Sequence, residues 1–120
     1  MNYLLDTHYL LWTIADTKKI SKKTKDIITN SENTIIISSI SFWVISGLAI
    51  EDIPQICTQM GFYIEPLSHT DSITYHHLKP DYHKDPFDKM LIWQALCNNY
   101  TLVTNDEKIK QYKALGLKIL

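Results

Sequence analysis

The amino-acid sequence predicts an α/β fold in which helices cover both faces of a parallel sheet. Short apolar or β-branched runs alternate with longer helical patterns along the 120 residues, and this alternation is typical of parallel sheets. Hydrophobic residues make up 45% of the chain, which is enough for a packed core without disulfides. We therefore expect residues 1–120 to form a single domain.

The amino-terminal part of the chain predicts a strand, two helices and a second strand. Residues 3–5 form a short apolar run, and residues 7–15 carry apolar side chains on one side of a helix. Ser21 suits the N-cap of a second helix that ends near residue 28. Residues 34–37 are mostly β-branched and predict the next strand.

The middle of the chain predicts further alternation. Residues 35–50 carry no charge, but this segment is shorter than the roughly 20 residues of a membrane span and contains four serines. We interpret it as a buried strand followed by a buried helix over residues 39–50. Pro54 favours the first turn of another helix, which ends near Gly61. A strand over residues 62–64 and a helix over residues 71–78 follow.

The carboxyl-terminal part predicts a helix, a strand, a helix and a final strand. Asp85 suits an N-cap and Pro86 the first position of a helix that reaches about residue 98. Residues 101–103 predict a strand, residues 107–112 a helix and residues 117–120 the last strand.

Charge and cysteine content limit the classes of function. The net charge is −1, from 12 basic and 13 acidic residues, which is not the balance of a strongly basic nucleic-acid binder. The two cysteines, Cys57 and Cys97, have no metal-ligand spacing and do not make a disulfide framework. We expect a cytoplasmic protein without a membrane segment, because the amino terminus also lacks the pattern of a signal peptide.

Polar residues follow three of the predicted strands. Asp6 and Thr7 follow the first strand, Ser39 follows the second, and Thr104 and Asp106 follow the fourth. In an open α/β sheet, ligands bind outside the carboxyl ends of the strands. These side chains would therefore lie together if their strands are neighbours.

Asp88 joins this group from a predicted helix. It shares a face with Leu91, Ile92 and Ala95, and that face should point at the sheet. A carboxylate at the head of a buried face is unfavourable unless a partner compensates its charge. Three aspartates without well-placed cysteine or histidine ligands suit a hard cation, Mg²⁺ or Mn²⁺.

Each aspartate also has a purely structural interpretation. Asp6 and Asp106 are equally well explained as N-caps of the helices that follow them, and Asp88 as an acid that favours the helix dipole. The histidines have no convincing ligand pattern, and His83 is expected to have a surface or packing role; His8 lies near Asp6 and could border the site.

Four segments together resemble the PIN-domain family, especially the toxin ribonucleases of the VapC type. They are LLDTH at 4–8 with LLW at 10–12, SSISFW at 38–43, HKDPFDK at 83–89 with LIWQAL at 91–96, and TLVTND at 101–106. The resemblance implies a three-layer sandwich around a five-stranded parallel sheet. It also implies Mg²⁺-dependent hydrolysis of RNA, which leaves a 5′-phosphate and a 3′-hydroxyl.

The resemblance also assigns roles to residues and partners. It implies that Asp6, Asp88 and Asp106 bind the metal, and that the hydroxyls of Thr7, Ser39 and Thr104 orient carboxylates or waters. It further implies a homodimer, a VapB-like antitoxin encoded next to the toxin, and a structured RNA target such as tRNA.

One position departs from the family pattern. Where the family usually has a glutamate after the tryptophan of the second motif, this chain has Val44 after Trp43. Valine cannot bind a cation, polarise water or accept a proton. The chain is thus either a ribonuclease weakened or inactivated at Val44, whether by nature or during cloning, or a PIN-domain module that binds an antitoxin or RNA without cleavage.

Overall fold

The computed structural model describes residues 1–45 and 50–120. Five parallel strands form one sheet in the order β3-β2-β1-β4-β5. This result confirms the predicted α/β class and the predicted five-stranded parallel sheet. The strands are β1 (Asn2–Leu5), β2 (Thr34–Ser38), β3 (Tyr63–Glu65), β4 (Thr101–Val103) and β5 (Lys118–Ile119).

Helices connect the strands, as the alternation in the sequence predicts. The α-helices are α1 (Thr7–Ala15), α2 (Lys22–Thr29), α3 (Ser39–Val44), α4 (Ile53–Gln59), α5 (His69–Thr74), α6 (Pro86–Asn98) and α7 (Glu107–Lys110). Short 3₁₀ helices are η1 (Thr17–Lys19), η2 (Ile50–Asp52), η3 (Tyr75–His77) and η4 (Gln111–Leu115).

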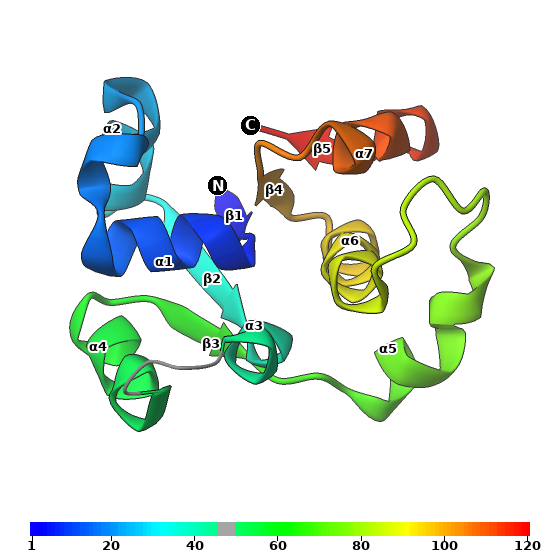
Figure 1. The fold of residues 1–120 in the computed structure, drawn as a ribbon, viewed down its shortest axis with the longest axis horizontal. Helices are drawn as coiled ribbons and strands as arrows, with labels where there is room; N and C mark the ends of the chain where they lie inside the picture. Colours follow the sequence, from blue (N-terminus) through cyan, green and yellow to red (C-terminus); the bar gives the residue numbers. More distant parts are fainter. Residues whose placement is uncertain (46–49) are drawn as a thin grey trace.

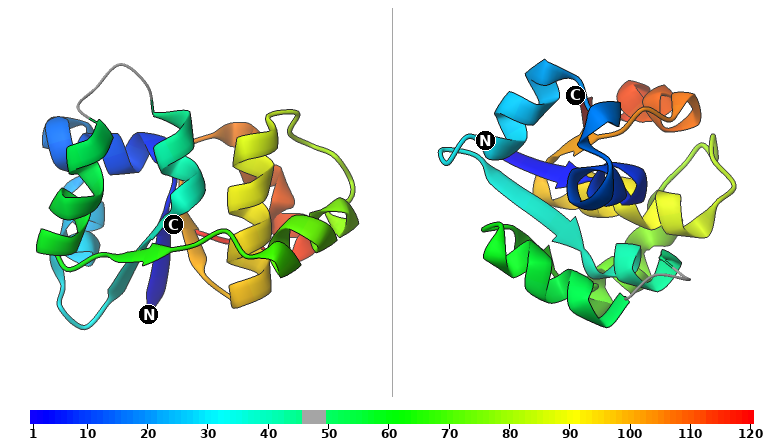
Figure 2. Two further views of the ribbon diagram at one scale, coloured as in Figure 1. Left: turned by 90° about the horizontal axis from the view of Figure 1, so that it is seen from below. Right: turned by 60° about the vertical axis from the view of Figure 1, so that its left-hand side comes forward.

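The helices cover both faces of the sheet, giving three layers (Figures 1 and 2). Successive side chains of a strand point to opposite faces. Accordingly, Tyr3 and Leu5 of β1 belong to the core under α1, α2 and α4, whereas Leu4 belongs to the core under α6, α7 and η4. The central strand therefore has no solvent-facing side, which explains its uninterrupted apolar run.

Three helices differ clearly from their predicted bounds. The helix expected over residues 107–112 ends at Lys110 and continues as the 3₁₀ helix η4. The helix expected over residues 39–50 ends at Val44, because Ile45 has an extended backbone with ψ of 124°; residues 46–49 lie outside the described residues. The helix expected over residues 71–78 begins earlier, at His69. The Ser68 hydroxyl accepts a hydrogen bond from the Asp71 N–H at 3.0 Å, and this N-cap fixes the true start.

The uncharged segment 35–50 begins as a buried strand, as predicted, and continues as a helix of only 6 residues. Across residues 1–45 and 50–120, every helix is too short or too polar to cross a membrane.

Candidate metal centre

The candidate site lies where the carboxyl ends of the three central strands meet. β1 is flanked by β2 and β4, and Leu5 pairs in register with Ile37 and with Val103. This register places Asp6 beside the ends of both neighbours, and its backbone N–H donates to the Val103 carbonyl at 3.1 Å. The carboxyl ends of β1, β2 and β4 are therefore neighbours. The sequence predicted that the polar side chains would lie together only on this condition.

Asp6 is a buried carboxylate with two firm hydrogen bonds. Its Oδ1 accepts the Tyr9 N–H at 2.8 Å and so caps α1, while its Oδ2 accepts the Thr104 hydroxyl at 2.6 Å. The residue is only 5% exposed. Burial raises the pKa of Asp6 in spite of these hydrogen bonds, so the negative charge lacks full compensation in the metal-free chain.

Asp106 likewise uses its two oxygens for different contacts. Oδ1 accepts the backbone N–H groups of Lys108 at 2.8 Å and Ile109 at 3.4 Å, and so caps α7. Oδ2 lies 3.1 Å from Nε2 of His83. Burial alone would raise the pKa of Asp106, but the hydrogen bonds from His83 and the two amides outweigh it and lower the pKa.

Asp88 enters the site from the first turn of α6. Asp85 caps this helix by accepting the Phe87 N–H at 2.9 Å, and Pro86 occupies its first position, as predicted. Asp88 Oδ2 lies 3.2 Å from His83 Nε2, and the Asp88 side chain is 26% exposed. Burial, followed by the nearby charge of Asp85, raises the pKa of Asp88.

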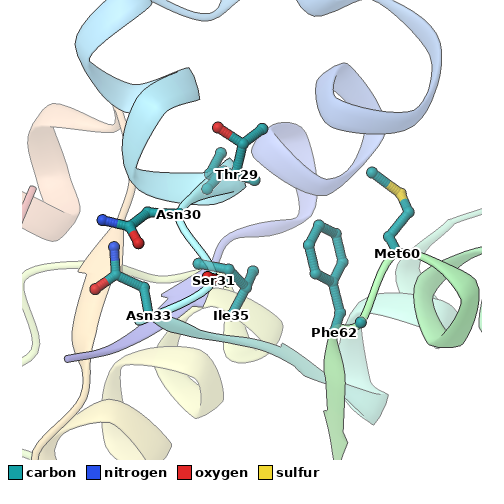
Figure 3. A pocket seen from close by; sticks show the side chains of 9 residues that line it. Thr29, Asn30, Ser31, Asn33, Ile35, Met60 and Phe62 are labelled. Atoms are coloured by element: carbon teal, nitrogen blue, oxygen red, sulfur yellow. The ribbon is translucent and has the colours of Figure 1, made fainter.

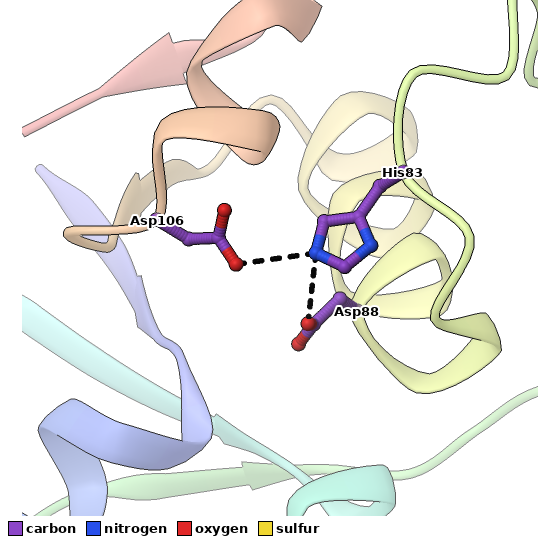
Figure 4. A group of neighbouring side chains, drawn as sticks. All are labelled: His83, Asp88 and Asp106. Atoms are coloured by element: carbon purple, nitrogen blue, oxygen red, sulfur yellow. Dashed lines mark hydrogen bonds and ion pairs between the residues drawn. The ribbon is translucent and has the colours of Figure 1, made fainter.

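His83 is the residue of the candidate site to which sequence analysis gave only a surface or packing role. It is 7% exposed and lies between Asp88 and Asp106 (Figure 4). One side-chain atom from each of these three residues lies within 4.8 Å of the others. His83 thus does more than pack in the core, because its imidazole contacts two of the predicted metal ligands. The chain holds no regular spacing that could have predicted this, since His83 sits in a loop.

The predicted supporting hydroxyls have unequal surroundings. Thr104 contacts Asp6 directly, as described above, and its oxygen also accepts the Asp106 N–H at 3.2 Å. Thr7 donates to the Ser41 hydroxyl at 3.1 Å. Ser39 is half-buried at the start of α3, and the neighbouring Ser38 makes the buried contact, donating to Gln94. Ser39 therefore lies beside the site without a demonstrated contact to a carboxylate.

Val44 faces the same hollow as Asp88. This hollow has a volume of about 290 Å³, and Thr7 and His8 also line it. Val44 is 40% exposed. A longer side chain at this position would therefore have space within the hollow. Glu51, the next acid along the chain, is exposed in η2 and is not among the residues that line this hollow.

A second hollow opens on the other side of Asp6. It has a volume of about 270 Å³ and is lined by Asp6, His8, Trp12, Asn105 and Asp106. The three aspartates thus border two adjoining hollows.

A larger hollow of about 550 Å³ lies at the opposite edge of the sheet, before β2 and β3 (Figure 3). Its lining is neutral and includes Asn30, Asn33, Met60 and Phe62. This hollow therefore lacks the acidic lining of the two hollows at the carboxyl-terminal edge.

The donors at this edge fit a hard divalent cation. Carboxylate oxygens are preferred ligands of Mg²⁺ and Mn²⁺, and a cation would compensate the burial that raises the pKa of Asp6 and Asp88. The lysine salt bridges of the described residues involve Asp16, Asp81 and Glu107, which lie outside this group. The arrangement can thus bind a cation next to an open hollow.

The parallel sheet with an acidic carboxyl-terminal edge defines the class of the protein: an α/β domain suited to metal-assisted chemistry. The sequence profile described as PIN domain matches residues 3–115, and the chain belongs to the PIN-domain family. PIN domains are typically metal-dependent ribonucleases. The chain matches no curated protein.

Solved structures share the fold at low sequence identity. A chain in the crystal structure of VapBC2 from Rickettsia felis, bound to a DNA fragment from its promoter, is 22% identical with a TM-score of 0.74; the alignment covers 100% of this chain and 98% of that one. VapBC-1 from nontypeable Haemophilus influenzae gives 15% identity, a TM-score of 0.68, and coverage of 100% and 97%. A PilT N-terminus domain protein from Sulfolobus solfataricus is 18% identical with a TM-score of 0.59, and the alignment covers 100% of this chain and 86% of that one.

Proposed function

We propose that the chain is a VapC-like toxin: a Mg²⁺-dependent endoribonuclease that hydrolyses RNA phosphodiesters and is weakened by Val44. The observation that carries this proposal is that Asp88 and Asp106 both approach Nε2 of His83, while the buried Asp6 lines the same hollow as Asp106. The three aspartates come from three separate elements of a PIN fold. A helix-capping role explains one oxygen of Asp6 and one of Asp106, but it does not explain why the acids gather.

The proposal gives each residue a defined task. Asp6, Asp88 and Asp106 hold Mg²⁺ or Mn²⁺ at the edge of the sheet. Thr104 orients Asp6 through its hydrogen bond, and Thr7 and Ser39 line the approach with hydroxyl groups. When bound, the cation supplies Lewis-acid activation of water and neutralises charge on the phosphodiester. The adjoining hollows leave one side of this group open to an RNA backbone.

Val44 reduces the activity because position 44 adds no carboxylate to the hollow that Asp85 and Asp88 line. Fewer negative ligands bind a divalent cation more weakly and favour fewer bound ions. Valine also offers no atom that could accept a proton from water.

A second candidate is a PIN-domain module that binds an antitoxin or RNA without cleavage. The observation that favours it is the same Val44, together with the exposed Trp43 next to it, which is 74% exposed. In this alternative Asp6 and Asp106 act only as helix caps, and Asp88 only favours the dipole of α6.

The partners of the chain follow from its relatives. The structures from Rickettsia felis and Haemophilus influenzae are VapBC complexes, and these support a VapB-like antitoxin as the partner of this chain. We also infer a homodimer, a structured RNA substrate such as tRNA, and a cytoplasmic location for the single domain 1–120.

The decisive experiment is cleavage of a total tRNA pool by the native chain and by Val44→Glu, each with Mg²⁺ and with EDTA. Cleavage by both proteins that EDTA abolishes means that three aspartates suffice. Cleavage by Val44→Glu alone means that the native chain is a nuclease inactivated at position 44. If neither cuts tRNA or total cellular RNA, the binding module replaces the ribonuclease as the preferred function.

A further inference from the structure

The backbone of the loop before α6 holds His83 in a fixed place. The His83 N–H donates to the Tyr112 hydroxyl at 3.1 Å, and Tyr112 is completely buried in the core under η4. The imidazole is therefore attached to the core by its own main chain. A side chain placed in this way has little freedom to turn, so its ring contacts are a stable property of the fold.

The hydrogen bonds of the ring define its tautomer. The backbone N–H of Asp85 donates to Nδ1 of His83 at 3.0 Å. A nitrogen that accepts an N–H carries no proton, so the proton of the ring sits on Nε2. Nε2 therefore acts as a hydrogen-bond donor.

This single donor faces two carboxylates. Nε2 donates to Oδ2 of Asp106 at 3.1 Å and lies 3.2 Å from Oδ2 of Asp88 (Figure 4). Two carboxylates that approach the same point repel one another unless a donor lies between them. The Nε2–H group supplies that donor and defines how near Asp88 and Asp106 come.

The same geometry argues against direct metal ligation by the ring. A histidine ligand presents a nitrogen that bears no proton to the metal. In His83 that nitrogen, Nδ1, is occupied by the Asp85 N–H, and Nε2 carries the proton.

We propose that His83 is a positioning residue of the metal centre: its Nε2–H sets the separation and orientation of the Asp88 and Asp106 carboxylates without binding the metal itself. This inference rests on the proposed function, because it assumes that these two aspartates bind the cation. It adds a fourth member to the site, and it explains why Asp106 is fixed at both oxygens, one by the start of α7 and one by His83. Outer partners of this kind typically change metal affinity about 10- to 100-fold.

The test compares His83→Leu, which has no donor, with His83→Gln, whose amide N–H can replace the Nε2–H. His76→Leu is the matched control, because His76 is exposed and its ring contacts the Ile73 carbonyl and the His77 ring, with no carboxylate among these contacts. Binding of Mn²⁺ is measured by electron paramagnetic resonance of the free ion, and circular dichroism confirms folding. We expect His83→Leu to bind Mn²⁺ at least about tenfold more weakly, His83→Gln to recover most of the affinity, and His76→Leu to match the native chain.

A spectroscopic measurement on the native chain keeps the inference falsifiable if His83→Leu does not fold. The native protein, labelled with ¹⁵N at histidine, should show no coupling between bound Mn²⁺ and a directly ligated histidine nitrogen. Nitrogen NMR of the metal-free protein should show a neutral His83 with its proton on Nε2. A direct coupling, or a proton on Nδ1, would overturn the positioning role.

The outcomes separate this inference from the proposed function. If the native chain binds Mn²⁺ and Asp88→Asn does not, but His83→Leu binds as well as the native chain, only the role of His83 is wrong. If the native chain binds no Mn²⁺, the proposed metal centre itself is wrong, and the metal role of His83 is overturned with it.

Discussion

The two sides of the candidate centre differ in how firmly the fold holds them. On one side lie Asp6, His83, Asp88 and Asp106, which we call the acidic side. His83 Nε2 contacts Asp88 and Asp106, Thr104 links Asp6 to the Asp106 backbone, and Asp6 and Asp106 cap helices. On the other side, which we call the α3 side, Trp43 and Val44 are exposed. The acidic side thus takes part in folding, whereas the α3 side is free to vary without disturbing a helix cap.

This difference teaches that the proposed metal centre could lose charge on one side while the other keeps its geometry. The acidic side has three carboxylates, and position 44 on the α3 side has none. Changes on the acidic side should therefore affect metal binding, helix ends and stability together. Changes on the α3 side should affect chemistry with little effect on folding.

The largest expected effect comes from Asp88→Asn on the acidic side. This substitution removes one of the three proposed ligand charges, and we expect Mn²⁺ affinity to fall by about 100-fold or more and metal-dependent RNA cleavage to disappear. Isothermal titration with Mn²⁺ and gel-based RNA cleavage measure the two effects. Asp85→Asn is the matched control: it also removes a charge near Asp88, but asparagine still caps α6. Equal losses in both variants would reduce Asp88 to an ordinary surface acid.

The second prediction makes the α3 side resemble the acidic side. Val44→Glu places a carboxylate in the hollow that Asp88 lines, and we expect Mg²⁺ or Mn²⁺ affinity to rise by roughly tenfold, with faster RNA cleavage. Val44→Gln has the same length without the charge and should leave affinity unchanged. An unchanged affinity in Val44→Glu would mean that this position does not face the cation.

The third prediction uses the raised pKa of Asp6. A raised pKa means that the folded chain holds the proton more tightly than the unfolded chain, so ionisation opposes folding as the pH rises above the ordinary value of 3.8. Asp6→Asn removes this charge and keeps a good N-cap for α1. We expect the metal-free variant to be about 1 kcal/mol more stable than the native chain at pH 7, and unable to gain stability from Mg²⁺.

The pH dependence provides the control for Asp6→Asn. The stability difference between the variant and the native chain should shrink as the pH falls toward about 4, where Asp6 becomes protonated in both states. Urea unfolding at several pH values, with EDTA present, measures this difference. A gap that stays constant across the range would show that burial of the Asp6 charge is not its cause.

The smallest expected effect lies on the α3 side. Trp43 is 74% exposed and meets the edge of Phe87 with ring centroids 5.1 Å apart. Trp43→Ala should therefore lower the free energy of unfolding by no more than about 1 kcal/mol. Phe42→Ala, next to it on α3, should lower it by more, about 2 kcal/mol or above, because Phe42 packs against the core. Chemical unfolding of both variants tests this contrast, which an equal loss would contradict.

The fold could be predicted from the sequence because its strands are short apolar runs bounded by polar residues. Residues 34–37 and 101–103, for example, lie within or coincide with β2 and β4. The error at α3 has a physical reason: residues 39–50 carry no charge and the two residues on either side of the boundary, Val44 and Ile45, are both apolar, so composition does not mark the end of the helix there. The start of α5 had a usable signal, since Ser68 stands three residues before Asp71, an arrangement typical of an N-cap.

The candidate site could be predicted only in part. Asp6 and Asp106 could be predicted because polar residues at strand ends gather at one edge of the sheet. Asp88 could be predicted because it lies on the apolar face of its helix. The role of His83 could not be predicted, because its position in the fold depends on contacts with Tyr112 and Asp106, which lie far away in the sequence. Local patterns carry no information about such a contact.

Asp6 and Asp106 each cap a helix and also face the candidate site, and this has a consequence for how such a protein evolves. Because each caps a helix as well as facing the site, most replacements there would harm folding, and a lineage that sheds activity at those positions risks losing the protein. Position 44 ends its helix without capping it and is exposed, so replacement there leaves the fold intact. Selection against a harmful activity would therefore meet least resistance at this position, and the scaffold would survive to keep any binding role it has.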